Sequence, residues 1–112
     1  MNNQPQQPYE LGEVRNESIS ESDNFSVERV TIRGNNAEVQ YTESNAVFVV
    51  EEGFGRFVIG GVPRLVQKGD VVHISKGIPF SNQGEMTLLA YYFPKLNNKN
   101  IVLYPLKLED ET

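Results

Sequence analysis

The sequence contains no cysteine, and this absence excludes several chemistries at once. Disulfide bridges, thiolate metal sites and a cysteine nucleophile all need the missing side chain. Tryptophan is also absent, and there is a single histidine, His73. One imidazole is too few to build a typical transition-metal site without help from carboxylates. We therefore expect neither a bound metal nor another cofactor.

Long apolar runs and basic clusters are missing as well. Apolar runs such as Ala46–Val50 are far shorter than the about 20 residues that span a bilayer. The N-terminal sequence MNNQPQQPYELGE has neither the basic nor the apolar region of a signal peptide. The ten Lys and Arg residues are scattered and the net charge is −5, which disfavours nucleic acid as a partner. We expect a cytoplasmic protein that binds neither membranes nor nucleic acid.

The remaining composition is that of an ordinary globular protein. The chain has 112 residues, of which 38% are hydrophobic and 22% charged, and this length favours one domain with one core. Residues 1–24 are polar and predict a flexible N-terminal arm. Residues 25–108 are expected to form a single β-barrel domain, and residues 109–112 an acidic tail.

Short β-rich segments begin at Phe25, and none has the period of a long helix. Gly60-Gly61 and Gly69-Asp70 indicate turns, and a further tight hairpin is expected between Gly53 and Gly55. Segments at intervals of about ten residues favour an all-β jelly roll or barrel. The expected strands are residues 25–33, 37–42, 46–52, 55–61, 63–68, 69–75, 86–93 and 100–107.

Two motifs with regular spacing occupy the middle of the chain. The first runs from Gly34 to Gly53, and the second is GDVVHISKGIPF, which begins at Gly69. In this order and at this separation they resemble the two motifs of the cupin superfamily, over residues 28–94. The resemblance implies a small double-stranded β-helix, which is a jelly-roll barrel of two antiparallel sheets.

Cupins bind a divalent metal through three histidines and one glutamate, and the resemblance places those four ligands at Gln40, Thr42, Ala46 and Phe80. Alanine and phenylalanine cannot bind a metal, and glutamine and threonine are weak neutral donors. The sequence therefore predicts a cupin framework whose usual metal ligands have been replaced.

The replacements predict a pocket for a small, largely uncharged organic ligand. Side chains alternate between the two faces of a strand, so Gln40 and Thr42 are expected to face the barrel interior together. Ala46 and Phe48 are expected to face it as well. Such a pocket would be mostly apolar with a few hydrogen-bonding groups. Alternatively, Ala46 and Phe80 fill the barrel and leave no cavity. The predicted ligand-binding residues are Gln40, Thr42, Ala46, Phe48, Phe80 and Tyr92.

Three functions remain open at this point. The first is a metal-free, non-catalytic or accessory protein that binds a small organic ligand. The second is an interaction or dimerisation module with a filled barrel. The third is a metal-independent isomerase, epimerase or cyclase, for which His73 and Tyr92 are the catalytic candidates because His titrates near neutral pH. Which face His73 occupies depends on the strand register.

The aromatic residues also suggest self-association. Of the neighbours Tyr91 and Tyr92, one must face into the barrel and the other outward. The outward tyrosine, together with Tyr41, Val47 and Val49, could form an apolar sheet face. We expect a homodimer that pairs through this face.

Overall fold

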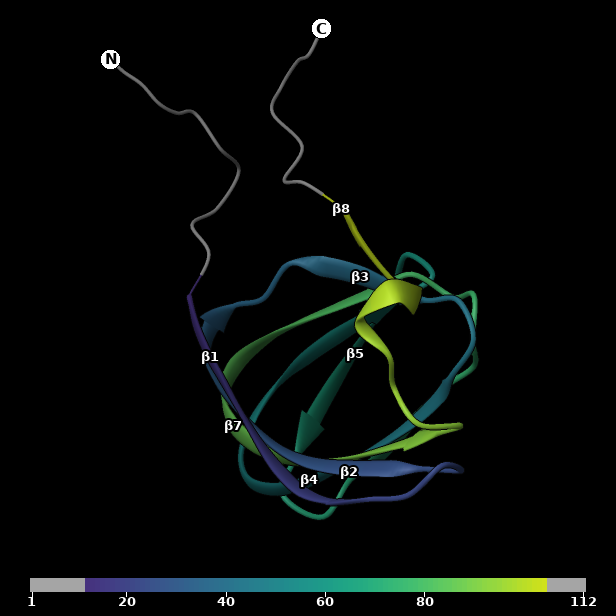
Figure 1. Cartoon of the computed structure of the whole chain (residues 1–112). Coiled ribbons are helices and arrows are strands. Elements are labelled where there is room, and N and C mark those ends of the chain that lie inside the picture. Colours follow the sequence, from purple (N-terminus) through teal and green to yellow (C-terminus); the bar gives the residue numbers. More distant parts are fainter. Residues whose placement is uncertain (1–11, 105–112) are drawn as a thin grey trace, which may run out of the picture.

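The structure, a computed structural model, describes residues 12–104, which form an almost entirely β fold (Figure 1). Among these residues no helix is long and apolar enough to cross a membrane. A 3-10 turn, η1 (Asn98–Asn100), precedes the last strand. The strands are β1 (Glu13–Glu21), β2 (Ser26–Asn35), β3 (Glu38–Tyr41), β4 (Asn45–Ile59), β5 (Val62–Gln67), β6 (Val71–Ile74), β7 (Phe80–Phe93) and β8 (Ile101–Tyr104).

Strand β7 organises the sheet because it pairs antiparallel with both β2 and β4. Strand β4 also pairs with β5 and β6, while β1 lies on the outer edge of β2. Strand β3 contacts the start of β7 and pairs with β8. The sheet curls around a single interior (Figure 1). The predicted all-β, cupin-like jelly roll is thus confirmed.

Alternation of inward and outward residues along β2, β7 and the first half of β4 builds the core. Val30 on β2, Leu88 on β7 and Val50 on β4 are cross-strand partners, and all three are buried. Their neighbours in sequence face outward, as expected for strands with a period of two. The buried apolar residues are Val30, Ile32, Ala46, Phe48, Val50, Phe57, Val66, Val72, Ile74, Phe80, Met86, Leu88, Ala90 and Tyr92.

The prediction of two strands, 46–52 and 55–61, joined by a hairpin at Gly53 is wrong. Strand β4 continues through Gly53 and stays paired with β7 on both sides of it. A register shift between Val50 and Glu52 bends the strand instead of ending it. Beyond the bend, Gly55 lies opposite Gly84 of β7, where the two backbones approach closely. These glycines therefore allow curvature rather than a turn.

The other two predicted turns are confirmed. Gly60 and Gly61 both have positive φ and join β4 to β5, with Ile59 paired to Val62. At the second turn the Asp70 carboxylate accepts a hydrogen bond from the Gln67 amide at 2.9 Å. This side chain therefore caps the backbone at the end of β5, which is the usual role of aspartate in such turns.

The expected N-terminal arm, residues 1–24, is wrong for the part that forms β1. This strand is polar and mostly exposed, and it is held by antiparallel pairing with β2 from Glu13↔Arg33 to Glu21↔Ser26. Its order comes from this ladder rather than from an apolar face of its own. Residues 1–11 and 105–112 lie outside the described residues, and with them the predicted acidic tail and the end of the strand expected at 100–107.

Gly53→Ala should destabilise the protein far more than Gly61→Ala. The two glycines have nearly the same φ, +84° and +86°, so the backbone strain of the two variants is matched. At Gly53 a Cβ would collide with the Glu85 carbonyl, whereas at Gly61 it would meet no atom within 4 Å. We expect Gly53→Ala to lower the free energy of unfolding by about 1–3 kcal/mol more than Gly61→Ala does, measured by urea denaturation. Equal losses would contradict a close β4–β7 contact.

Candidate functional site

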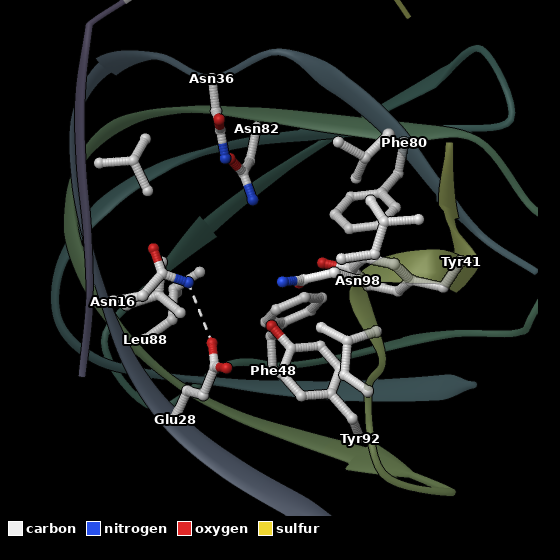
Figure 2. Close-up of a pocket in the computed structure, with 15 residues that line it drawn as sticks. Asn16, Glu28, Asn36, Tyr41, Phe48, Phe80, Asn82, Leu88, Tyr92 and Asn98 are labelled. Atoms are coloured by element: carbon white, nitrogen blue, oxygen red, sulfur yellow. Dashed lines mark hydrogen bonds between the residues drawn. The ribbon is translucent and has the colours of Figure 1, made fainter. Parts of the chain in front are cut away.

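The barrel contains a cavity of about 230 Å³, so its interior is not filled by side chains. Phe48 and Leu88 lie at its base, whereas the exposed residues Asn16 and Asn98 lie where it opens to solvent (Figure 2). The filled-barrel form of the interaction-module hypothesis is therefore wrong. The lining residues are Val14, Asn16, Glu28, Val30, Asn36, Val39, Tyr41, Phe48, Phe80, Asn82, Leu88, Tyr92, Leu96, Asn98 and Ile101.

One wall of the cavity is aromatic. Tyr41 lies edge-to-face against both Phe80 and Tyr92, with ring centroids 5.4 Å apart in each pair. Phe48 contacts the same group, 5.6 Å from Phe80 and 6.2 Å from Tyr92. Edge-to-face and tilted contacts of this kind favour a fixed arrangement of rings. The wall is thus a preorganised apolar surface supplied by β3, β4 and β7.

The opposite wall carries two polar side chains, Asn16 and Glu28, beside the apolar Leu88 (Figure 2). Glu28 is an inward residue of β2, as are Ser26 and Val30 two positions away on either side. Asn16 of β1 donates a hydrogen bond from Nδ2 to Glu28 Oε1 at 2.9 Å. This bond leaves the second carboxylate oxygen available to the cavity.

Amide groups lie between these two walls. Asn36 donates from Nδ2 to Asn82 Oδ1 at 3.1 Å, and Asn36 Oδ1 accepts from the Ala37 amide at 2.9 Å. With its carbonyl oxygen engaged, the buried Asn82 directs its NH₂ group into the cavity (Figure 2). Asn98 of η1 also places its amide there. The cavity therefore offers donors from asparagine and an acceptor from Glu28.

The two cavity tyrosines hold their protons tightly. Burial raises the pKa of Tyr41 to about 12, and burial likewise raises the pKa of Tyr92, with the nearby Tyr41 contributing. The two rings are also in edge-to-face contact, with centroids 5.4 Å apart. Because desolvation disfavours the phenolate, both side chains act as neutral hydrogen-bonding groups over the physiological pH range.

Three of the six predicted ligand residues, Phe48, Phe80 and Tyr92, line the cavity. Ala46 is buried in the core without lining the cavity, and Gln40 and Thr42 do not line it either. The reason is register on β3, which turns the odd-numbered residues Val39 and Tyr41 inward. The prediction that Gln40 and Thr42 share the inner face is wrong by one residue.

His73 does not face the cavity, so the pairing of His73 with Tyr92 as catalytic residues is wrong. On β6 the buried residues are Val72 and Ile74, and His73 between them is exposed on the outer surface next to Val47. Tyr92 is the inward residue of the two neighbouring tyrosines.

The outward residues of β2, β4 and β7 partly match the apolar sheet face that was predicted for self-association. Tyr91 lies beside Val47 on β4 and Val27 on β2. Val49 is the next outward residue of β4. Tyr41, which was expected on this face, lies in the cavity instead.

The polar residues of the site were missed by sequence reasoning. Glu28 is one of many charged residues on predicted strands, and only its place between the inward Ser26 and Val30 distinguishes it. Asn16 was assigned to the arm, and Asn98 lies in a segment with no strand pattern. The alternation in FSVERVTIR was a usable signal for Glu28, but the other two residues depend on tertiary structure.

The four positions that the sequence resemblance assigns to cupin metal ligands do not fit a metal. Gln40 accepts a hydrogen bond from the Tyr104 hydroxyl on β8, and the Thr42 hydroxyl donates to a main-chain carbonyl at 3.2 Å. Ala46 and Phe80 offer no donor atom. Among residues 12–104 no group of three or more His, Cys, Asp or Glu side chains could hold a metal ion.

The raised tyrosine pKa values predict a loss of stability in alkali. The folded state keeps these hydroxyls protonated, while unfolded tyrosines ionise near pH 10. The contribution of Tyr41 is therefore complete below pH 10 and is lost as the pH rises toward 12. In Tyr41→Phe the free energy of unfolding should fall less steeply with pH over this range than in the native protein. The expected difference in slope is about 1.4 kcal/mol per pH unit, measured by urea denaturation. Identical slopes in the variant and the native protein would contradict burial of Tyr41.

Comparison with known proteins gives the fold. No protein-family model matches the chain, and no curated protein sequence is significantly similar to it. Solved structures do match. A variant of the Streptomyces protein Pac13 with uridine is 15% identical with a TM-score of 0.75, and the alignment covers 94% of this chain and 93% of that chain. Pac13 is a nucleoside dehydratase.

Two further structures agree. Ectoine synthase from P. lautus is 12% identical with a TM-score of 0.70, covering 88% of this chain and 81% of that chain. A Klebsiella pneumoniae protein with a double-stranded β-helix domain is 14% identical with a TM-score of 0.71, covering 83% and 85%. The chain therefore has the cupin fold, a double-stranded β-helix, as its two motifs implied.

Proposed function

We propose that this chain binds a small uncharged ring compound in the barrel cavity, without a metal, as an accessory, carrier or sensor protein. The observation that carries the proposal is one cavity with an aromatic wall facing a wall of amide and carboxylate groups. Binding sites for small molecules combine these same two elements, an apolar surface for contact area and a few polar groups for orientation.

The size of the cavity limits the ligand. A volume of about 230 Å³ corresponds to roughly eight water molecules at about 30 Å³ each. Asn16 and Asn98 line the opening and are exposed, so part of the ligand can remain in solvent. A compound of one or two rings fits these limits, whereas a long-chain lipid or a peptide helix does not.

Nucleosides are the first class to test. A pyrimidine ring can contact the aromatic wall while its carbonyl groups accept hydrogen bonds from Asn82 and Asn98. The sugar hydroxyls can donate to Glu28. Pac13, whose fold is similar, has been solved with uridine. At 15–16% identity that similarity concerns the fold, and it supports uridine as a probe.

Binding is favoured over catalysis by the chemistry of the cavity residues. Tyr41 and Tyr92 release their protons with difficulty because burial raises the pKa of both. They therefore supply hydrogen bonds rather than transferable protons. The cavity lining within residues 12–104 contains no histidine or lysine, so Glu28 would have to act as a base without a matched acid.

Uridine should bind to protein that has been treated with EDTA, and a side chain that plugs the opening should prevent it. Asn98→Phe introduces a ring at an exposed cavity position, so the fold is not required to repack. Lys99→Phe is the matched control, because Lys99 is a neighbour in η1 that does not line the cavity. We expect affinity to fall at least about tenfold, or about 1.4 kcal/mol, in Asn98→Phe alone, measured by isothermal titration calorimetry.

Two results would overturn this proposal. If uridine and other nucleosides leave the cavity amide signals unshifted in NMR spectra at millimolar concentration, the nucleoside class is wrong. If Lys99→Phe weakens binding as much as Asn98→Phe, the ligand is not in the cavity.

We also propose that the chain forms a homodimer through the outer face of β2, β4, β6 and β7. Tyr91 lies at the centre of this face, with Val27 on one side and Val47 on the other. Tyr91 is 39% exposed and Phe93, two residues along the same strand, 40% exposed. A twofold axis near Tyr91 would bury both rings against a second copy, and closed twofold pairing is the commonest oligomer arrangement.

Tyr91→Lys should convert the dimer to a monomer, because each interface would then bury two unpaired ammonium groups. Leu103→Lys is the control, since Leu103 is an exposed residue of β8, away from this face. Light scattering after size-exclusion chromatography measures the mass directly. A native protein that elutes with the 12.7 kDa mass of one chain would contradict the proposal.

A further inference from the structure

Glu28 brings a negative charge into the cavity with no cation beside it. Among residues 12–104, the cavity lining has no other carboxylate and no lysine, arginine or histidine. The next residue, Arg29, lies on the other face of β2, where it pairs with Glu51 at 3.0 Å and Glu17 at 3.7 Å. None of the ion pairs of the described residues includes Glu28. Its charge is thus available to a ligand.

The carboxylate is oriented but not saturated. An ionised carboxylate only accepts hydrogen bonds, and its two oxygens offer about four positions. The bond from Asn16 at 2.9 Å occupies one position on Oε1 and fixes the direction of the group. The second carboxylate oxygen has no hydrogen bond to the residues drawn around the cavity (Figure 2). Glu28 can therefore accept two or more further hydrogen bonds at once.

The aromatic wall lies within reach of the same ligand. In the β2–β7 ladder Glu28 is opposite Ala90 and Ser26 is opposite Tyr92, so Glu28 and Tyr92 are diagonal neighbours on the inner face. Such neighbours have Cα atoms about 7–8 Å apart, which is about the width of one ring with its substituents. A ring in contact with Tyr92 would present its substituents to the carboxylate.

This geometry has opposite consequences for donors and for anions. Hydroxyl or ammonium groups would form charge-assisted hydrogen bonds with Glu28, which are shorter and stronger than neutral ones. A phosphate or carboxylate would instead bring a second negative charge close to Glu28, beside an apolar aromatic wall. Repulsion between like charges is strongest in such a setting.

We propose that Glu28, oriented by Asn16, is a subsite that accepts the hydrogen-bond donors of a ring compound and rejects anionic ligands. The assignment to nucleosides rests on the proposed function above. For that class, Glu28 accepts from the vicinal ribose hydroxyls and selects nucleosides over nucleotides. Glu28 is then a specificity-determining residue, and Asn16 positions it.

The test compares uridine, 2′-deoxyuridine and uridine 5′-monophosphate on three proteins by calorimetry. In the native protein we expect uridine to bind best and the monophosphate worst. Glu28→Gln should weaken uridine binding about ten- to hundredfold, the range for a hydrogen bond to a charged group. It should also abolish the preference for uridine over 2′-deoxyuridine and reduce discrimination against the monophosphate. Glu17→Gln makes the same change in net charge outside the cavity and should bind all three compounds like the native protein.

A second set of probes separates this inference from the nucleoside proposal. Cyclohexane-1,2-diol, cyclohexylamine and cyclohexanecarboxylate share one ring and differ in the charge and hydrogen bonding of the substituent. By NMR titration, the diol and the amine should shift cavity signals in the native protein but not in Glu28→Gln, and the carboxylate should shift them in neither. The same spectra show whether each variant is folded.

The outcomes are distinct. If uridine fails but the diol and the amine bind in a Glu28-dependent way, the nucleoside class is wrong and the subsite stands. The subsite is overturned if cyclohexanecarboxylate binds as well as the diol, if none of the three compounds binds, or if Glu28→Gln binds uridine and the diol like the native protein.

Discussion

The interior depends on an alternation of large and small side chains across β7. Tyr92 is flanked by Ser26 on β2 and Ala46 on β4, while Ala90, two residues earlier, is flanked by Glu28 and Phe48. Each large side chain thus has at least one small cross-strand neighbour, which leaves room for it to extend inward. Because side chains are close-packed in most protein interiors, large residues at all six positions would fill the barrel. The small residues keep the space between the aromatic and polar walls open.

The same alternation explains how the barrel keeps an open cavity although the four positions that the resemblance assigns to cupin metal ligands do not supply its polar groups. Two of those positions do not line the cavity: Gln40 is hydrogen-bonded to Tyr104 of β8, and Thr42 to a carbonyl of η1. A third, Phe80, belongs to the aromatic wall. Polar groups enter instead from other elements, Glu28 from β2 and Asn16 from β1. The polar groups of the cavity thus come from positions other than those four.

The fold could be predicted from the sequence much more fully than the site. Strand spacing and two glycine motifs are local properties, and they were sufficient for the jelly roll and for the turn at Gly60. Continuity of β4 through Gly53 was missed because a positive φ at glycine permits a bend as readily as a turn. The site depends on register, and a shift of one residue on β3 exchanged Gln40 for Tyr41 at the cavity. Asn16 could not be predicted, because β1 has no apolar face and is ordered by its partner strand.

Register also fixes the sign of the charge in the cavity. Glu28 and Arg29 are adjacent, and because strand side chains alternate, one had to face inward and the other outward. The inward Glu28 has Asn16 as its partner, and the outward Arg29 is neutralised by Glu17 and Glu51. A slip of β2 by one residue would bring the guanidinium into the barrel and make the same cavity attract anions. Pairing of β2 with both β1 and β7 over most of its length prevents that slip. The preference of the cavity for donors is thus set by backbone pairing as well as by the choice of side chain.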